Sequence, residues 1–185
     1  MRITRTTAAV VSFVSVAAAA GLSAVPAAAA QAGPQGAQRI SVDEYVRSGG
    51  DPSALRAGAK APTCWSKQFT DSLSIWFPVK GDVKFAVYGY TGKWCLSGSS
   101  LWRMAIMNAY TQNTGAGTVV YDSKSHRTIG RTVWNNKYAI GVEQFSMAGT
   151  VSVLSFTKSF SFDRCIRSWG NHSGRSWQSG SCNVT

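Results

Sequence analysis

The last 122 residues of the chain, from Cys64 to Thr185, contain few of the residues from which helices are built. They hold 25 Val, Ile and Thr and 19 aromatic residues, against four Leu, six Ala and a single Glu. β-Branched and aromatic side chains fit the pleated surface of a sheet and lose rotamer freedom in a helix. The segment 64–185 therefore predicts an all-β domain.

Strand candidates recur along this segment at intervals of about 10 to 14 residues. They cover 72–79, 83–90, 101–110, 117–122, 127–134, 138–147 and 150–162. Turn-forming residues separate several of them, namely Lys80 with Gly81 and Asp82, Asn135 with Asn136, and Ala148 with Gly149. Short strands at this spacing predict a disulfide-stabilised antiparallel sandwich or barrel of about seven strands, preceded by a short helical N-terminal arm.

The apolar alternation changes phase inside the candidate strand 138–147. Tyr138, Ile140 and Val142 share one parity, whereas Phe145 and Met147 have the other. A bulge or a strong bend turns the following side chains to the opposite face. We therefore predict such an irregularity here, and it leaves both the sandwich and the barrel open.

Four cysteines fall within segment 64–185, and in an oxidising compartment they predict two disulfides. We favour Cys64 with Cys95 and Cys165 with Cys182, because the second bridge closes a short segment too poor in apolar residues to order itself. A nested pairing is the open alternative. The sequence has no Cys-x-x-Cys motif, and neither histidine lies at zinc spacing from a cysteine. We expect no metal site and no cofactor.

Segment 1–32 has the pattern of a secretory signal peptide. Arg2 and Arg5 form a charged start, an apolar stretch runs from Ala8 to Leu22, and small residues come after it. No later stretch has the roughly 18 uncharged apolar residues of a membrane helix. We expect a secreted, extracellular protein without a stable membrane anchor.

Segment 33–63 differs from segment 64–185 in carrying helix signals. Ser41 and Glu44 form the capping box of a first short helix, and Asp51 with Pro52 begins a second. Neither helix has much apolar surface to bury. The segment is interpreted as a docked N-terminal arm, a spacer or a removable pro-segment, and all three stay open.

Charge points to the class of partner. The chain carries 19 Lys and Arg against 8 Asp and Glu, a formal net charge of +11 at pH 7. A cationic surface attracts anionic partners and speeds their encounter. This balance favours an extracellular polysaccharide or another anionic polymer as the partner.

Cations and flat aromatic rings alternate in segment 164–182, in a background of Gly, Ser and Asn. Arginine pairs with carboxylate, sulfate or phosphate groups, and tryptophan faces stack on flat rings. A disulfide at the two ends would hold this segment in shape for binding. We predict a ligand-binding loop made of Arg164, Arg167, Trp169, His172, Arg175 and Trp177. The alternative is that the two tryptophans only cover the disulfide and one end of the domain.

The sequence lacks the signature motifs of serine hydrolases, phosphate-binding loops and zinc proteases. The leading prediction is therefore a secreted, basic, non-catalytic binding module for anionic or carbohydrate polymer such as cell-wall material.

A rival prediction is a small secreted hydrolase, such as a ribonuclease, that uses Glu143 with His126 or His172 and an arginine. It requires Glu143 to face a cleft with one of the histidines within hydrogen-bond reach. The simpler interpretation of Glu143 is an outward-facing strand residue paired with a cation.

A third prediction is an antimicrobial or membrane-acting protein. Small polar residues interleave with Val153, Phe156, Phe160 and Phe162 along an unusually long candidate strand. An amphipathic hairpin of this kind can insert into a membrane. Any half-exposed antiparallel strand shows the same alternation, so the pattern is not specific.

Overall fold

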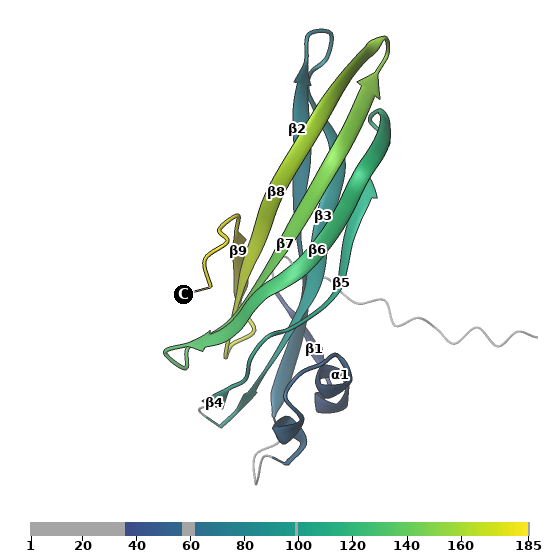
Figure 1. The fold of residues 1–185 in the computed structure, drawn as a ribbon. Helices are drawn as coiled ribbons and strands as arrows, with labels where there is room; N and C mark the ends of the chain where they lie inside the picture. The colour runs from purple at the N-terminus through teal and green to yellow at the C-terminus, as the bar shows by residue number, and fades with distance from the viewer. Residues whose placement is uncertain (1–35, 57–61, 99, 185) are drawn as a thin grey trace, which may run out of the picture. The chain divides into compact units, whose positions relative to one another are not determined.

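The computed structural model describes residues 36–56, 62–98 and 100–184, so the predicted signal peptide lies outside the described residues. These residues form nine strands, one α-helix and one 3-10 helix (Figure 1). The all-β class is confirmed, with more strands than the seven expected. Three short strands at the margins were not expected, namely β1 (Gln38–Ile40), β4 (Ser100–Leu101) and β9 (Ser176–Ser179), whereas the candidates 117–122 and 127–134 form one continuous strand, Thr118–Trp134.

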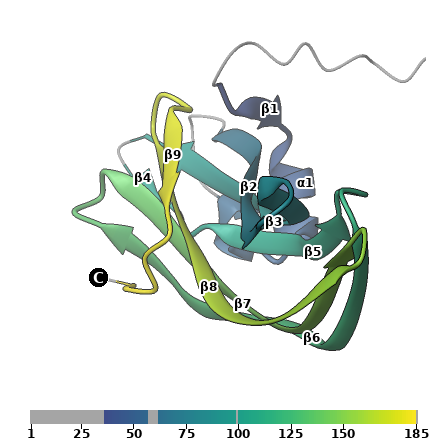
Figure 2. The ribbon, with the colours of Figure 1, turned by 90° about the horizontal axis from the view of Figure 1, so that it is seen from above.

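The strands form two antiparallel sheets, so the fold is a sandwich rather than a barrel. In the first sheet β1 pairs with β2 (Thr63–Phe77) and β2 with β3 (Gly81–Ser97), and β3 pairs with both β4 and β5 (Ala105–Asn113). The second sheet has the order β6 (Thr118–Trp134), β7 (Tyr138–Val153), β8 (Phe156–Asn171) and β9. Figure 2 shows β6, β7 and β8 curving around β3 and β5.

The core lies between the two sheets and is strongly aromatic. Phe69 and Phe85 from the first sheet and Phe145 and Phe160 from the second are all buried in it. The rings of Phe85 and Phe160 are 4.8 Å apart between centroids. This is where the aromatic content of the sequence is buried, and it accounts for the sheet-on-sheet arrangement.

The predicted turn at Ala148 and Gly149 is wrong, because both residues lie inside β7. A Cβ on Gly149 would meet the carbonyl oxygen of Val120 at 2.1 Å. Glycine therefore serves a close approach of β6 to β7 rather than a reversal of the chain. The reversal comes later, at Leu154 and Ser155, between the register pair formed by Val153 and Phe156.

The irregularity predicted within 138–147 lies in the neighbouring strand rather than in β7: the pairing of β6 with β7 shifts register between Thr128 and Gly130, opposite Glu143 and Val142. β7 keeps one register with β8 from Tyr138 to Val153. Phe145 and Met147 face the inter-sheet core, whereas Ile140 and Val142 are buried on the opposite face of the same sheet. The change of phase arises because this part of β7 is covered on both faces.

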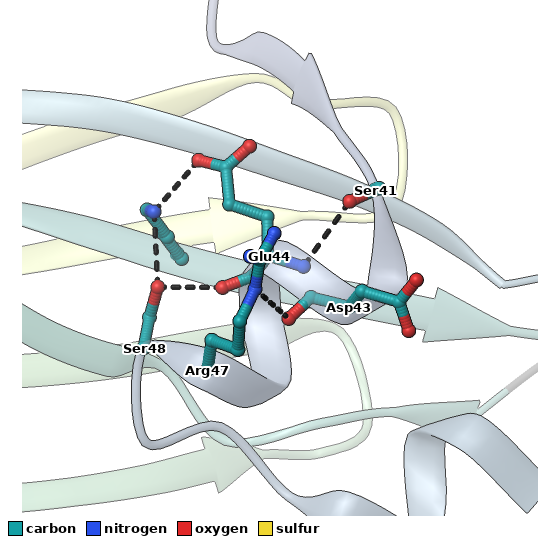
Figure 3. A network of polar contacts seen from close by, with 6 residues as sticks. Ser41, Asp43, Glu44, Arg47 and Ser48 are labelled. Atoms are coloured by element: carbon teal, nitrogen blue, oxygen red, sulfur yellow. Dashed lines mark hydrogen bonds and ion pairs between the residues drawn. The ribbon is translucent and has the colours of Figure 1, made fainter.

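The N-terminal arm has the expected helices, α1 (Val42–Arg47) and η1 (Pro52–Arg56). Ser41 caps α1 by accepting a hydrogen bond from the Glu44 backbone N–H at 3.1 Å. Figure 3 shows Glu44 and Ser48 directed to one side of the helix, where both contact the Lys93 ammonium. Tyr45 is fully buried. The described part of the arm is therefore packed on the domain, while its removal as a pro-segment stays a prediction.

Both disulfides form with the favoured pairing, Cys64 with Cys95 and Cys165 with Cys182. The first joins β2 to β3 and lies under α1, in a cluster with Tyr45. The second ties the C-terminal segment to β8. Among the described residues, no helix is long and apolar enough to cross a membrane.

Candidate functional site

The C-terminal segment predicted as a loop is a hairpin. Residues up to Asn171 belong to β8, a turn comes next, and the chain returns as β9. The Asn171 side-chain oxygen accepts hydrogen bonds from the backbone N–H groups of Ser173 and Arg175, at 3.0 and 2.9 Å. This local capping and the Cys165–Cys182 disulfide hold the hairpin in one conformation.

The hairpin places two of the predicted tryptophans against each other. Trp169 and Trp177 are register partners of β8 and β9. Their rings are stacked, with centroids 6.1 Å apart and an interplanar angle of 14°. The Arg167 guanidinium lies 4.8 Å from the centre of the Trp169 ring. Three of the six predicted ligand residues therefore come together on one sheet face.

Two further aromatic residues continue this line. Tyr138 meets Trp177 edge to face at 5.1 Å, and Trp134 stacks on Tyr138 at 5.6 Å with an interplanar angle of 18°. We call Trp134, Tyr138, Trp169 and Trp177 the aromatic strip. Trp134 is 52% exposed and Trp177 41% exposed, so the strip presents aromatic surface to solvent.

The sequence analysis did not include Trp134 and Tyr138 among the candidate ligand residues. They are a cross-strand pair, since they face each other across the turn at Asn135 and Asn136. The available signal was the turn itself, because two aromatic residues flanking a tight hairpin must lie on the same face. What the sequence could not supply was that this face adjoins the hairpin of β8 and β9.

The strip rests on a buried cluster. Trp169 packs with Tyr138 against Ile140, Val142 and Cys165. The alternative interpretation of Trp169 as a cover for the disulfide is thus part of its role. Trp177 and Trp134 extend beyond that cover, and a rigid base beneath them limits the entropy lost on binding a ligand.

The other predicted ligand residues lie apart from the strip. The Arg164 guanidinium is 5.5 Å from the Phe162 ring, on the face of β8 that carries the core residues. His172 and Arg175 are exposed in the turn between β8 and β9. The predicted loop site is therefore redrawn around Arg167, Trp169 and Trp177.

The structure also brings together two residues of the rival catalytic prediction. The His126 Nδ1 atom of β6 is 2.9 Å from the Glu143 Oε1 atom of β7. Glu143 is only 2% exposed, whereas the His126 side chain is 49% exposed. The expectation that Glu143 faces outward is wrong, because its parity in β7 is that of the core residues Phe145 and Met147.

The charge of Glu143 acts on buried polar groups of the core. Its Oε2 atom has no hydrogen-bond partner among the described residues. Burial raises the pKa of the nearby Tyr90 phenol, the Ser168 hydroxyl opposes that rise and the Glu143 charge adds to it. The Tyr90 hydroxyl donates to the Gly141 carbonyl at 3.1 Å. Glu143 thus sits at the margin of a buried polar network.

An ionised Glu143 accepts hydrogen bonds only, so it favours the tautomer in which His126 carries its proton on Nδ1. The other ring nitrogen is then an acceptor available to a proton donor. An open hollow of about 530 Å³ is lined by Ser125, His126, Arg127, Gln144, Ser146 and Asp163. Gln144 and Ser146 alternate along β7 with Glu143 and Phe145, so these two lining residues lie on the sheet face opposite to Glu143, and His126 is the member of the pair that borders the hollow.

His172 does not join this pair. Glu143 is in register with Ile166, and His172 lies beyond the end of β8, about 20 Å further along the strand direction. Within the part of the chain that the structure describes, no three His, Cys, Asp or Glu residues are grouped so that they could hold a metal ion.

Comparison of the chain with known protein families, with curated proteins and with solved structures finds no match. The function is therefore argued from the geometry of the two sites.

Proposed function

We propose that the protein is a secreted, non-catalytic binding module that holds a carbohydrate polymer, such as cell-wall material, on the aromatic strip. The observation that carries this proposal is the line of ring contacts from Trp134 through Tyr138 and Trp177 to Trp169. Two of its members, Trp134 of β6 and Trp177 of β9, leave 52% and 41% of their surface exposed.

Exposed tryptophan faces in a row suit an extended ligand with flat apolar faces. The C–H faces of pyranose rings meet this description, and stacking on an aromatic ring removes apolar surface of both partners from water. The strip crosses β6, β7, β8 and β9 on the sheet surface. An open surface of this kind fits a polymer that continues past the site better than an enclosed small molecule.

Positive charge beside the aromatic strip favours polymers that carry anionic groups. Arg167 lies beside Trp169, and Lys137 is exposed in the turn that follows Trp134. Both are cations at the edge of the strip, where a carboxylate or phosphate substituent of a bound polymer would find a partner. The net charge of the chain supports encounter with such a polymer.

Export is part of the proposal. Two disulfides are typical of proteins that fold in an oxidising compartment, and the N-terminal segment has the composition of a signal peptide. Determining the N-terminus of protein recovered from the medium of an expressing host tests this part directly.

Co-sedimentation with insoluble cell-wall material and polysaccharides tests the binding proposal. We expect Trp134→Ala and Trp177→Ala each to weaken binding about tenfold, which corresponds to about 1.4 kcal/mol of lost contact. Trp76→Ala is the matched control, because Trp76 is similarly exposed at 55% but lies in β2.

Salt separates stacking from nonspecific charge. Binding through the strip should persist at high ionic strength, where attraction between exposed charges is screened. Binding that disappears in salt and is equal in all three variants would refute the strip as the site.

A second candidate function rests on the contact between His126 and Glu143. In this alternative the protein is a hydrolase, such as a ribonuclease, with His126 as general base and Glu143 as the group that orients it. It ranks second because the Glu143 carboxylate is buried and does not line the hollow. If it is correct, the protein degrades RNA, His126→Ala loses this activity and His172→Ala keeps it. Intact RNA after prolonged incubation rules out the ribonuclease.

A further inference from the structure

Three hairpin turns meet at the end of the sandwich opposite the arm (Figure 1). They connect β2 to β3, β5 to β6 and β7 to β8. A hollow between them is lined by residues from all three turns, including Lys80, Gly115 and Leu154. The Lys158 ammonium of β8 donates to the Trp76 carbonyl of β2 at 2.6 Å, which holds the first and third turns together. We call this end, formed by residues 76–84, 114–118 and 152–158, the hairpin tip.

The hairpin tip exposes large apolar side chains. Leu154 is 78% exposed, Trp76 55%, Val79 48% and Phe156 39%. Single exposed apolar residues are ordinary, whereas several gathered on one projecting end indicate a contact surface. Phe77 and Val153 beside the same turns are buried in the core, so these four are the apolar side chains that the turns leave to solvent.

Leu154 is unfavourably placed in two respects. Its φ is +56°, a left-handed conformation that costs a non-glycine residue free energy and disfavours a branched apolar side chain. The turn between β6 and β7 meets the same demand with Asn135 and Asn136, at φ of +47° and +50°. Asparagine tolerates this conformation and is hydrated. Because Leu154 is both strained and exposed, its side chain does not serve the folded domain itself. We interpret it as a residue that contacts a binding partner.

The charges at the hairpin tip are mostly positive. Segments 76–84, 114–118 and 152–158 contain Lys80, Lys84 and Lys158 against one acidic residue, Asp82. The Lys158 ammonium lies 5.4 Å from the Trp76 ring and 5.5 Å from the Phe77 ring, so its stem runs along apolar surface while its charge stays at the rim. The hairpin tip thus combines exposed apolar side chains with lysine side chains beside them.

We infer that the hairpin tip docks on an anionic lipid bilayer, with Leu154, Trp76 and Phe156 entering the boundary between headgroups and acyl chains. Tryptophan is enriched at that boundary, and lysines beside it pair with lipid phosphates. The exposed apolar side chains of the turns, with lysines beside them, are complementary to the negatively charged surface of such a bilayer. This function is separate from polymer binding, because the hairpin tip and the aromatic strip share no residue.

Sedimentation of the purified protein with vesicles tests the inference. The two compositions are phosphatidylcholine alone and phosphatidylcholine mixed with phosphatidylglycerol, and the N-terminus of the protein is first determined by mass spectrometry. We expect binding to the mixed vesicles, weaker binding to phosphatidylcholine, and a blue shift of tryptophan emission that is lost in Trp76→Phe.

Leu154→Asn is the decisive variant. Asparagine relieves the left-handed strain, so the thermal midpoint should be unchanged or higher, while vesicle binding falls about tenfold or more. A Lys80→Glu and Lys158→Glu double variant should lose the preference for phosphatidylglycerol by a similar factor. Leu55→Asn is the matched control, since Leu55 is 54% exposed but lies in η1.

Three results overturn the inference. The first is the absence of binding to phosphatidylglycerol vesicles. The second is equal binding by wild type and Leu154→Asn. The third is a wild-type dimer in sedimentation velocity that Leu154→Asn dissociates without any change in vesicle binding, since a second copy of the chain would then be what covers the hairpin tip.

Discussion

Gly170 shows how strongly single residues constrain this sandwich. A Cβ at this position would lie 2.3 Å from the ring of Trp94, which is fully buried and donates its indole N–H to the Asn171 carbonyl at 3.0 Å. Burial and this hydrogen bond both oppose a shift of the ring. Gly170→Ala should therefore lower the free energy of unfolding by about 1–3 kcal/mol, measured by urea denaturation.

Gly180→Ala is the control for that substitution. The nearest atom to a Cβ there is the Cys165 carbonyl oxygen at 3.9 Å, an ordinary contact. Its unfolding free energy should match wild type within about 0.5 kcal/mol. Equal stabilities for the two variants would show that Trp94 can yield.

The buried tyrosines predict a loss of stability in alkali. Burial raises the pKa of Tyr88 and Tyr90 above the ordinary value of 10.0, and for Tyr88 the charge of Asp71 adds to the rise. The unfolded chain then releases these protons at lower pH than the folded protein. Stability from this source is complete below pH 10 and falls as the pH increases beyond it.

Ultraviolet titration of tyrosinate, followed together with circular dichroism, checks this prediction. Exposed tyrosines should ionise first without loss of structure. Tyr88 and Tyr90 should ionise only as the protein unfolds. A single ionisation step near the ordinary pKa, with the circular dichroism unchanged, would contradict burial of these hydroxyls.

Part of the candidate site was visible in single residues. Trp169 and Trp177 stood out because they alternate with arginines in a segment poor in apolar residues. Trp134 did not, and the burial of Glu143 could not be foreseen, because the role of a strand residue depends on which face is covered. That covering comes from segments distant in sequence, such as the C-terminal Val184, which packs in the cluster with Ile140 and Val142.

Among the elements, the arm depends on one buried cation. Lys93 of β3 is 7% exposed, and its ammonium contacts Glu44 Oε1 at 2.7 Å and Ser48 Oγ at 3.0 Å (Figure 3). Glu44→Gln removes the counter-charge and leaves a desolvated ammonium, so it should destabilise the protein by about 1–3 kcal/mol. Lys93→Met should have a smaller effect, because Glu44 is 44% exposed on its side chain and can be hydrated.

Urea denaturation gives the stabilities, and hydrogen exchange of 41–56 shows whether the arm opens first. Asp43→Asn is the control, since Asp43 lies on the same helix and is exposed to solvent. A larger loss from Lys93→Met than from Glu44→Gln would mean that the lysine acts mainly through the packing of its stem.

Turn chemistry explains which elements the sequence could predict. Asn135 and Asn136 indicate a turn because asparagine tolerates positive φ, and the turn is there. Leu154 gives no such indication, since leucine is not a turn residue. Gly149 suggests a turn where the structure has an uninterrupted strand. Glycine is suited both to a turn and to a close approach of two strands. Only the position of the neighbouring strand shows which of these two roles a given glycine has.

For the molecule as a whole, composition was enough for the all-β class and the disulfides, but not for the division into two sheets. That division depends on β5 pairing with β3 while β6 begins a second sheet with β7. The connection between β5 and β6 is a short turn, which would equally suit two strands of one sheet. Whether β5 and β6 belong to one sheet or to two is determined by core packing between residues far apart in the sequence.

The aromatic strip and the hairpin tip lie at opposite ends of β7, which runs 16 residues from Tyr138 to Val153. At the rise of an extended strand this separates them by about 50 Å. Sites this far apart without shared contacts should act independently. Trp134→Ala with Trp177→Ala should abolish polymer binding and leave vesicle binding intact, whereas Leu154→Asn should do the reverse.

Wild-type protein should also bring vesicles to insoluble polymer, because one molecule can engage both surfaces at once. Fluorescent vesicles that sediment with the polymer only in its presence, and with neither set of variants, would establish this bridging. If the tryptophan variants lose both activities while remaining folded, the two surfaces are not separate, and a single continuous face must account for both kinds of binding.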